Sequence, residues 1–175
     1  QSSISNSAAL KIDSDNVLLW KHSVSRLEAE LIRDSILAVS GQLNNKMGGQ
    51  GFRDFKMYNH KGSWVYDPID PEGPEFNRRS IYRTWARGSI HPLLAPLDCP
   101  DPSASAPVRT TTTTPLGALS LMNTSFVLKM SDLFAERLKA ETGKNIEAQI
   151  KRGFQLAFLR GPKAKEKELI EQFVR

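Results

Sequence analysis

The chain has 175 residues, of which 39% are hydrophobic and 25% are charged, and its formal net charge is +5. This length and composition suit one globular domain with a hydrophobic core and exclude a disordered segment. No apolar run approaches the roughly 20 residues that a membrane-spanning helix requires. The single cysteine, Cys99, excludes an internal disulfide, and without a C-x-x-C motif the chain attaches no c-type haem of its own. Because the sequence starts at Gln1, without methionine or a signal segment, we expect a processed product or a fragment of something longer.

The positive net charge suits polyanions such as nucleic acid, acidic glycans or anionic lipid. A modest excess of this size is more often an ordinary solvated face. No recognition helix, zinc-finger spacing or RNA-binding aromatic signature accompanies it, so nucleic acid is not expected as a partner.

The first predicted element in chain order is an amphipathic helix from Arg26 to Ser40. Ser25 and Glu28 have the spacing of a capping box, and Gly41 suits the left-handed turn that follows many helices. The stripe expected to face the core consists of apolar residues at helical spacing: Leu27, Leu31, Ile32, Ile36, Ala38 and Val39.

Residues 42–114 are predicted to be a loop-rich insert with a little β-structure. A hairpin is expected around Lys61 and Gly62, and the alternation over residues 79–87 indicates a further strand. The proline-rich stretch 91–108 is predicted to be an extended loop lying over the core.

Residues 115–175 are predicted to be helical. Thr114 is a favourable N-cap, Pro115 suits the first helical position, and Leu116, Leu119 and Met122 fall on one face of the helix that follows. Further helices are expected from about residue 125 to Gly143, over 146–160 and over 164–174. The chain is therefore predicted to be mainly α, a single helical domain or domain fragment with a small irregular β insert and a long proline-rich loop. Its parts are 1–41 with the first helix, 42–114 with the insert, and the helical part 115–175.

Five motifs stand in a fixed order along the chain: RLEAELIRDSILAVSG, RRSIYRTWARG, LDCPDPS, TPLGALSLMN followed by TSFV, and FQLAFLRGP followed by KAKEKE. In this order, over about 15–175, the chain resembles the planctomycete domain of unknown function found at the C-terminal end of large proteins that begin with a planctomycete-type cytochrome c module. The resemblance implies that the chain is the C-terminal part of that domain. It also implies an extracytoplasmic protein, periplasmic or at the cell surface, with a c-type haem in an upstream domain. It implies no established activity.

The chain departs from the pattern T-N-T-P-L-Q-A-L that is usual in the family. Thr113 replaces the asparagine, and Gly117 replaces the glutamine that would complete a capping box with the threonine cap. We interpret these positions as structural caps that vary between members.

No complete catalytic or metal-binding motif is present. The three histidines, His22, His60 and His91, have no spacing that places two on one helix face, so no metal site is expected. The sequence has no nucleophile elbow and no phosphate-binding or dinucleotide-binding glycine pattern, and it identifies no catalytic residue.

The strongest polar constellation combines arginines with one carboxylate: Arg78, Arg79, Arg83, Arg87, Asp98 and Arg109. If 79–87 is a strand, Arg79, Arg83 and Arg87 share a face, and guanidinium groups suit carboxylate or sulfate ligands. The alternative is structural: buried arginines that pin the proline-rich loop, with Asp98 in an ion pair. Arg33 and Asp34 are likewise expected to be ion-pair partners between elements.

Tyr58, Trp64 and Tyr66 form a second candidate site, an aromatic platform for sugar rings. Aromatic residues in a short hairpin more often pack the hairpin itself.

Two functions follow from these observations. The first is a non-catalytic structural or interaction module of a larger, redox-linked protein, which docks on upstream domains or binds a glycan or another polyanion. The second is part of an oxidoreductase or carbohydrate-active enzyme whose site is completed by an upstream half. No cofactor is expected in this chain itself.

Overall fold

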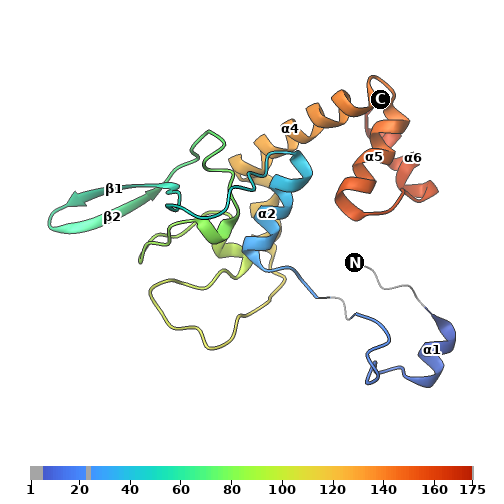
Figure 1. Ribbon diagram of the computed structural model, residues 1–175, viewed down its shortest axis with the longest axis horizontal. Helices are drawn as coiled ribbons and strands as arrows, with labels where there is room; N and C mark the ends of the chain where they lie inside the picture. Colours follow the sequence, from blue (N-terminus) through green and yellow to red (C-terminus); the bar gives the residue numbers. More distant parts are fainter. Residues whose placement is uncertain (1–5, 23–24, 175) are drawn as a thin grey trace.

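The structure is a computed structural model that describes residues 6–22 and 25–174. It is mainly helical with one small antiparallel hairpin, which confirms the predicted fold class (Figure 1). The elements are α1 (Ser7–Ile12), α2 (Ala29–Ser40), β1 (Phe55–His60), β2 (Ser63–Pro68), the 3₁₀ helices η1 (Ser80–Tyr82) and η2 (Ala95–Leu97), α3 (Pro115–Asn123), α4 (Ser125–Thr142), α5 (Ile146–Phe158) and α6 (Ala164–Val174). None of the helices in this described part is long and apolar enough to span a membrane.

The long helix α4 lies at the centre of the helical packing, because three other helices contact it. It packs along α2, it contacts α3 at its N-terminal end and α5 at its C-terminal end, and α6 packs against α5. The β1–β2 hairpin projects on the side of the molecule away from α5 and α6 (Figure 1). Helix α1, which was not predicted, lies apart from the other helices (Figure 1). The hairpin turns at Lys61 and Gly62, as predicted.

Helix α2 begins three residues later than predicted and buries a different face. Its N-cap is Glu28, whose side chain makes no capping hydrogen bond, so the predicted capping box is absent. The buried residues are Ala29, Arg33, Leu37 and Ser40, whereas Leu27 and Leu31 of the predicted stripe are exposed. The buried face of α2 is turned away from the predicted stripe because it includes Arg33, whose guanidinium finds enough hydrogen-bond acceptors inside the protein to be buried.

The start of the proline-rich stretch forms part of the core, so the prediction that the whole stretch lies over the core was wrong, whereas residues 99–108 form a loop as predicted. Leu93, Leu94 and Leu97 are almost fully buried and cluster with Ala29 of α2. His91 stabilises the turn that carries them, because its Nδ1 accepts the backbone N–H groups of Leu93 and Leu94 at 3.1 and 3.2 Å. The composition indicated an extended loop, but the closely spaced prolines Pro92 and Pro96 are compatible with the compact turn that contains η2.

The predicted strand over 79–87 was also wrong. Residues 80–82 form η1, closed by the N–H of Arg83 donating to the carbonyl of Ser80 at 3.0 Å. Only isolated bridges remain in this segment, from Arg83 to Phe52 and from Arg78 to Asn44. An alternating pattern does not form a strand here, because the backbone groups are satisfied by turns and by a neighbouring loop.

Helix α3 has the predicted start, and its apolar stripe faces outward. Thr114 Oγ1 accepts the N–H of Gly117 at 3.1 Å, as expected of an N-cap. The helix buries its small residues, Gly117 and Ser120, and a Cβ atom at Gly117 would lie only 3.0 Å from the Pro96 carbonyl oxygen. Gly117 therefore allows α3 to approach η2 closely, a packing role that the capping comparison did not suggest.

The C-terminal helices match their predicted positions, although α5 ends two residues early at Phe158. Ile150 and Phe154 of α5 are buried as expected, but Phe158 is exposed, and so are Leu169 and Phe173 of α6. This end of the chain is therefore only partly covered by its own helices.

Candidate functional site

A buried ionic cluster lies where three loop segments meet. Arg83 Nε donates to Asp54 Oδ2 at 2.6 Å, and the two side chains are only 2% and 7% exposed. His91 Nε2 lies 3.3 Å from the same oxygen. Because Nδ1 of His91 accepts backbone N–H groups, the ring proton is on Nε2 and faces Asp54. Burial raises the pKa of Asp54, but the hydrogen bonds from His91 and Arg83 outweigh it and hold this pKa below its ordinary value.

Arg33 of α2 extends this cluster toward the helices. Its guanidinium lies over the rings of Phe52 and Phe126, at 5.2 and 5.4 Å from their centroids, and donates to the carbonyls of Arg78 and Phe76. Burial lowers the pKa of Arg33, while the charges of Asp34 and Asp54 oppose that shift. These contacts give Arg33 a structural role between elements through hydrogen bonds and ring contacts, whereas its ion pair is with Asp34 of the same helix and not with another element as predicted.

Asp34 beside it fixes the start of η1. One carboxylate oxygen accepts both the backbone N–H and the hydroxyl of Ser80, each at 2.7 Å. Arg33 Nη1 lies 3.7 Å from that oxygen. Asp34 is engaged by Ser80 and Arg33 by backbone carbonyls, so these contacts give both side chains a structural role.

An open cleft of about 640 Å³ adjoins the ionic cluster. Its walls are the C-terminal end of α2, the acidic segment 69–77 and the N-terminal half of α4, and Arg33, Asp54 and His91 line it on the cluster side. The acidic segment is tied to α4 at two exposed points, since Ser125 donates to Asp70 and Lys129 to Glu72. The Lys129 contact lowers the pKa of Glu72.

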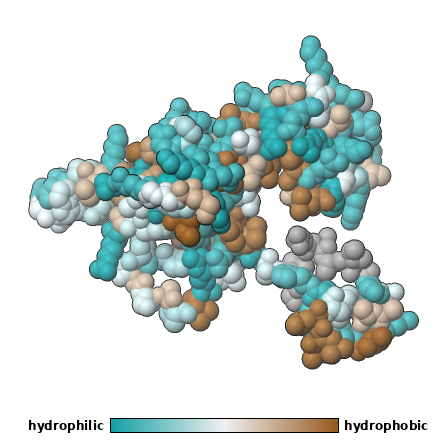
Figure 2. All heavy atoms as spheres, viewed as in Figure 1, coloured by the Kyte–Doolittle hydropathy of each residue, from teal (hydrophilic) through white to brown (hydrophobic). Residues whose placement is uncertain are grey.

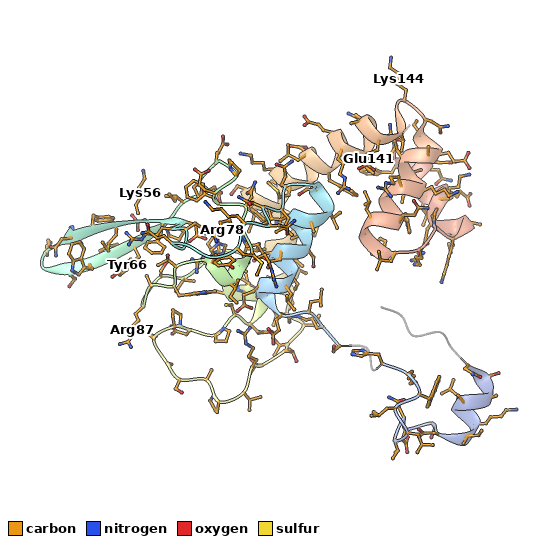
Figure 3. All side chains as sticks on the ribbon, in the orientation of Figure 1. Lys56, Tyr66, Arg78, Arg87, Glu141 and Lys144 are labelled. Atoms are coloured by element: carbon orange, nitrogen blue, oxygen red, sulfur yellow. The ribbon has the colours of Figure 1, made fainter. Side chains whose placement is uncertain are left out.

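The predicted arginine face does not form. Arg83 is buried in the cluster, whereas Arg79 is exposed and 3.7 Å from Asp34, and Arg87 points away at the edge of the molecule (Figure 3). With 80–82 in a 3₁₀ turn, side chains four residues apart no longer share a face.

Arg78 has a structural role, because it holds the loop 46–50 in place. Its buried guanidinium donates to the carbonyls of Lys46, Gly48 and Gln50 at 2.6–3.2 Å and stacks on the ring of Tyr82, 4.0 Å from the centroid. One side chain thereby orders the glycine-rich loop that precedes β1.

Asp98 and Arg109 are engaged with different partners. Asp98 accepts from Arg26 Nη1 at 2.8 Å and from the backbone N–H of Thr112 at 2.6 Å. These contacts, the Thr112 amide first, lower the pKa of Asp98 to about 2. Arg109 forms a two-pronged pair with Glu30 of α2 at 2.8 and 2.9 Å. Together they hold the loop 98–112 against the start of α2.

The three hairpin aromatics lie on two faces. Residues directly opposite each other in an antiparallel pair share a face. Tyr58 is opposite Val65, whereas Trp64 is opposite Asn59 and Tyr66 is opposite Met57. Trp64 and Tyr66 therefore share one face and Tyr58 occupies the other, so no platform of all three exists.

Comparison with protein families gives a match over residues 1–174 to the family PSD1, described as "Protein of unknown function (DUF1553)". The chain belongs to this family. The expected domain of unknown function is thereby confirmed, whereas the link to a cytochrome c module stays a prediction. No curated protein and no solved structure matches this PSD1 chain.

Within this PSD1 chain, sequence reasoning missed Asp54 and the cleft beside it. Asp54 stands two residues after the buried Phe52, and that spacing was the only local sign that it points inward. Its hydrogen-bonding partners, Arg83 and His91, come from loops distant in the sequence, so no spacing in the sequence connects them with Asp54. Among the described residues no group of three or more His, Cys, Asp or Glu side chains is placed to hold a metal ion.

Cys99 lies beside Glu30 and Arg109 at the edge of the core. Burial raises the pKa of Cys99 to about 12, and the charge of Glu30 adds to the effect. A thiol with so high a pKa is a poor nucleophile, because the thiolate is the reactive form.

Proposed function

We propose that this chain is a non-catalytic docking module of a larger extracytoplasmic, redox-linked protein, and that α3 packs against an upstream domain of the same polypeptide. The proposal is carried by one observation, the outward face of α3. Leu116, Leu119 and Met122 are 61%, 53% and 68% exposed.

These three residues are spaced three apart, so they form one continuous stripe along the helix. A surface helix ordinarily turns such a stripe to the core and its small residues to solvent. Helix α3 does the reverse, since Gly117 and Ser120 face η2 and the core. A contiguous exposed apolar stripe of this kind is typical of an interaction surface.

Two further regions expose large apolar side chains. One follows α1 and the other is the end formed by α5 and α6, and both show as brown surface in Figure 2. Their exposed residues are Ile12, Val17, Leu18 and Leu19 in the first region and Phe158, Leu159, Leu169, Phe173 and Val174 in the second. Exposure at several places supports a chain that packs against more than its own 175 residues.

The non-catalytic part of the proposal is supported by the ionic contacts. His91 uses both ring nitrogens inside the protein, Asp98 is paired with Arg26 just before α2, and Arg109 is paired with Glu30 of α2. A general acid or base needs an atom within reach of substrate. No contact among the described residues favours the alternative, an oxidoreductase or carbohydrate-active enzyme completed upstream.

The context of the module rests on the resemblance described above. A reduced pyridine-haem spectrum of the full-length protein from its native host tests it. A covalent c-type haem signal is the expected result, and its absence would contradict the redox-linked part of the proposal. The docking part is independent of that result.

The docking face is tested by replacing Leu116, Leu119 and Met122 together with glutamine. The variant is expected to keep the thermal unfolding midpoint of the parent chain and to bind less of a fluorescent apolar dye, because the stripe is a surface in the isolated chain. Met47→Gln, at an exposed loop position, is the matched control. Unfolding of the triple variant would identify the stripe as core and overturn the proposal.

A further inference from the structure

We propose that the cleft between the acidic segment 69–77 and α4 is a binding site for an uncharged saccharide. This site uses a different surface from α3, so the inference does not depend on the docking role.

The size of the cleft suits a small ligand. Its volume of about 640 Å³ lies within the range of roughly 300–1,000 Å³ that is usual for small-molecule sites, and a disaccharide is of this class. The cleft is open to solvent, so a ligand can enter without unfolding its walls.

Most charged side chains that line the cleft already have an ionic or hydrogen-bonding partner within the protein, whereas Asp70 accepts only from the neutral Ser125 hydroxyl. Lys129 donates to Glu72, and Asp54 receives Arg83 and His91. Arg33 is occupied by backbone carbonyls and by aromatic rings. An anionic ligand would have to displace the internal partners of Lys129 or Arg33, and that disfavours an anion.

Two neutral polar groups remain unused. The half-buried side chains of Gln42, at the end of α2, and Asn77, in the acidic segment, line the cleft and make no hydrogen bond to any residue that the structure describes. Each amide offers two donors and an acceptor oxygen. Sugar hydroxyl groups both donate and accept, so they match a primary amide better than a purely acidic or purely basic ligand would.

The remaining wall of the cleft is apolar. Ile69 and Pro71 contribute from the acidic segment, and Met130 and Leu133 from α4. A sugar ring carries hydroxyl groups at its rim and C–H groups on its faces. Apolar walls with a few fixed polar groups are the arrangement that such an amphipathic ring requires.

The test is saturation-transfer NMR on the full 175-residue chain. The probes are neutral disaccharides (cellobiose, maltose, lactose, xylobiose, mannobiose and chitobiose) at millimolar concentration. We expect transfer to at least one of them. The double variant Gln42→Ala, Asn77→Ala should bind that disaccharide roughly tenfold or more weakly, because each lost hydrogen bond weakens binding severalfold. Gln155→Ala, an exposed amide on α5, should bind as the parent does.

Neither alanine removes a bond that holds the fold, and Asn77 keeps the backbone carbonyl that accepts from Asn44. If the double variant nevertheless unfolds, the nearly isosteric Asn77→Asp takes its place and should weaken binding by removing the donors. The inference is overturned if no neutral disaccharide binds, or if binding survives in the folded cleft variants. Loss of binding on Trp64→Ala alone would equally overturn it, since the hairpin would then be the site. The α3 glutamine variant should bind the saccharide normally.

Discussion

Arg83 and Asp54 form the most buried ion pair that the structure describes, with Nε and Oδ2 2.6 Å apart. The pair joins the segment before β1 to the segment after η1, and His91 adds the turn that carries the core leucines. Three segments with little regular structure are thus fixed at one carboxylate. The stability of the whole insert should depend on it.

Asp54→Asn should destabilise the chain strongly. The substitution leaves Arg83 buried without a counter-charge, and breaking one side of a buried pair typically costs about 3–5 kcal/mol. Urea denaturation followed by circular dichroism measures the change. Asp101→Asn is the control, because Asp101 is exposed and its side chain bonds only to Ser103. A change no larger than in the control would show that the cluster is not a structural centre.

Stability should fall in acid through Asp98. Its pKa is about 2 in the folded chain, against an ordinary value of 3.8. Because the folded value is the lower one, the stabilisation is complete well above pH 3.8 and is lost as the pH falls from 3.8 toward 2.

Asp98→Asn isolates this effect. Asp98 has a left-handed backbone with φ of 62°, which asparagine also tolerates, so the variant keeps the backbone and loses the charge and one acceptor oxygen. The difference in unfolding free energy between parent and variant should be constant near neutral pH and should vanish at the acid end. A difference that is independent of pH throughout would contradict the assignment.

Arg78→Lys should loosen the loop 46–50 even though it keeps the charge. A lysine ammonium cannot serve three carbonyls in the plane of a guanidinium or stack flat on Tyr82. We expect a loss of about 2 kcal/mol or more, because hydrogen bonds to a charged group typically contribute 1.5–3 kcal/mol each. Faster amide exchange in this loop is the direct readout. Arg87→Lys, at an exposed position, should change neither quantity.

Cys99 should react slowly with iodoacetamide in the folded chain. Burial raises its pKa to about 12, so the thiolate fraction near pH 8 is very small. Alkylation followed by mass spectrometry should be on the order of a hundredfold slower in buffer than in urea, where the pKa returns toward 8.5. Equal rates in the two solvents would mean that the thiol is not held beside Glu30.

The helices were predictable because their signals are local. Thr114 and Pro115 mark the start of α3, Gly41 and Gly143 mark the ends of α2 and α4, and the hairpin turn at Lys61 and Gly62 is equally local. Each of these depends on a backbone preference that acts within a few residues.

Which face a helix buries was not predictable in the same way. Periodicity showed the apolar stripe of α2, but the acceptors that allow Arg33 to be buried come from residues more than 40 positions away. In α3 the sequence showed the stripe but not that it faces outward, because the close contact with η2 that buries Gly117 and Ser120 arises only in the folded chain. The cluster at Asp54 could not be predicted for the same reason, since Asp54, Arg83 and His91 meet only in the folded chain.

The central claim, that α3 docks on another part of a longer polypeptide, is tested most directly by photo-crosslinking. A benzophenone amino acid at position 122 of the full-length protein should crosslink to a peptide of the same polypeptide outside the 175 residues. The same group at Lys144, which points outward in the turn after α4 (Figure 3), should give no such product. If position 122 crosslinks to nothing, or only to a second copy of this chain, the docking role of α3 is contradicted.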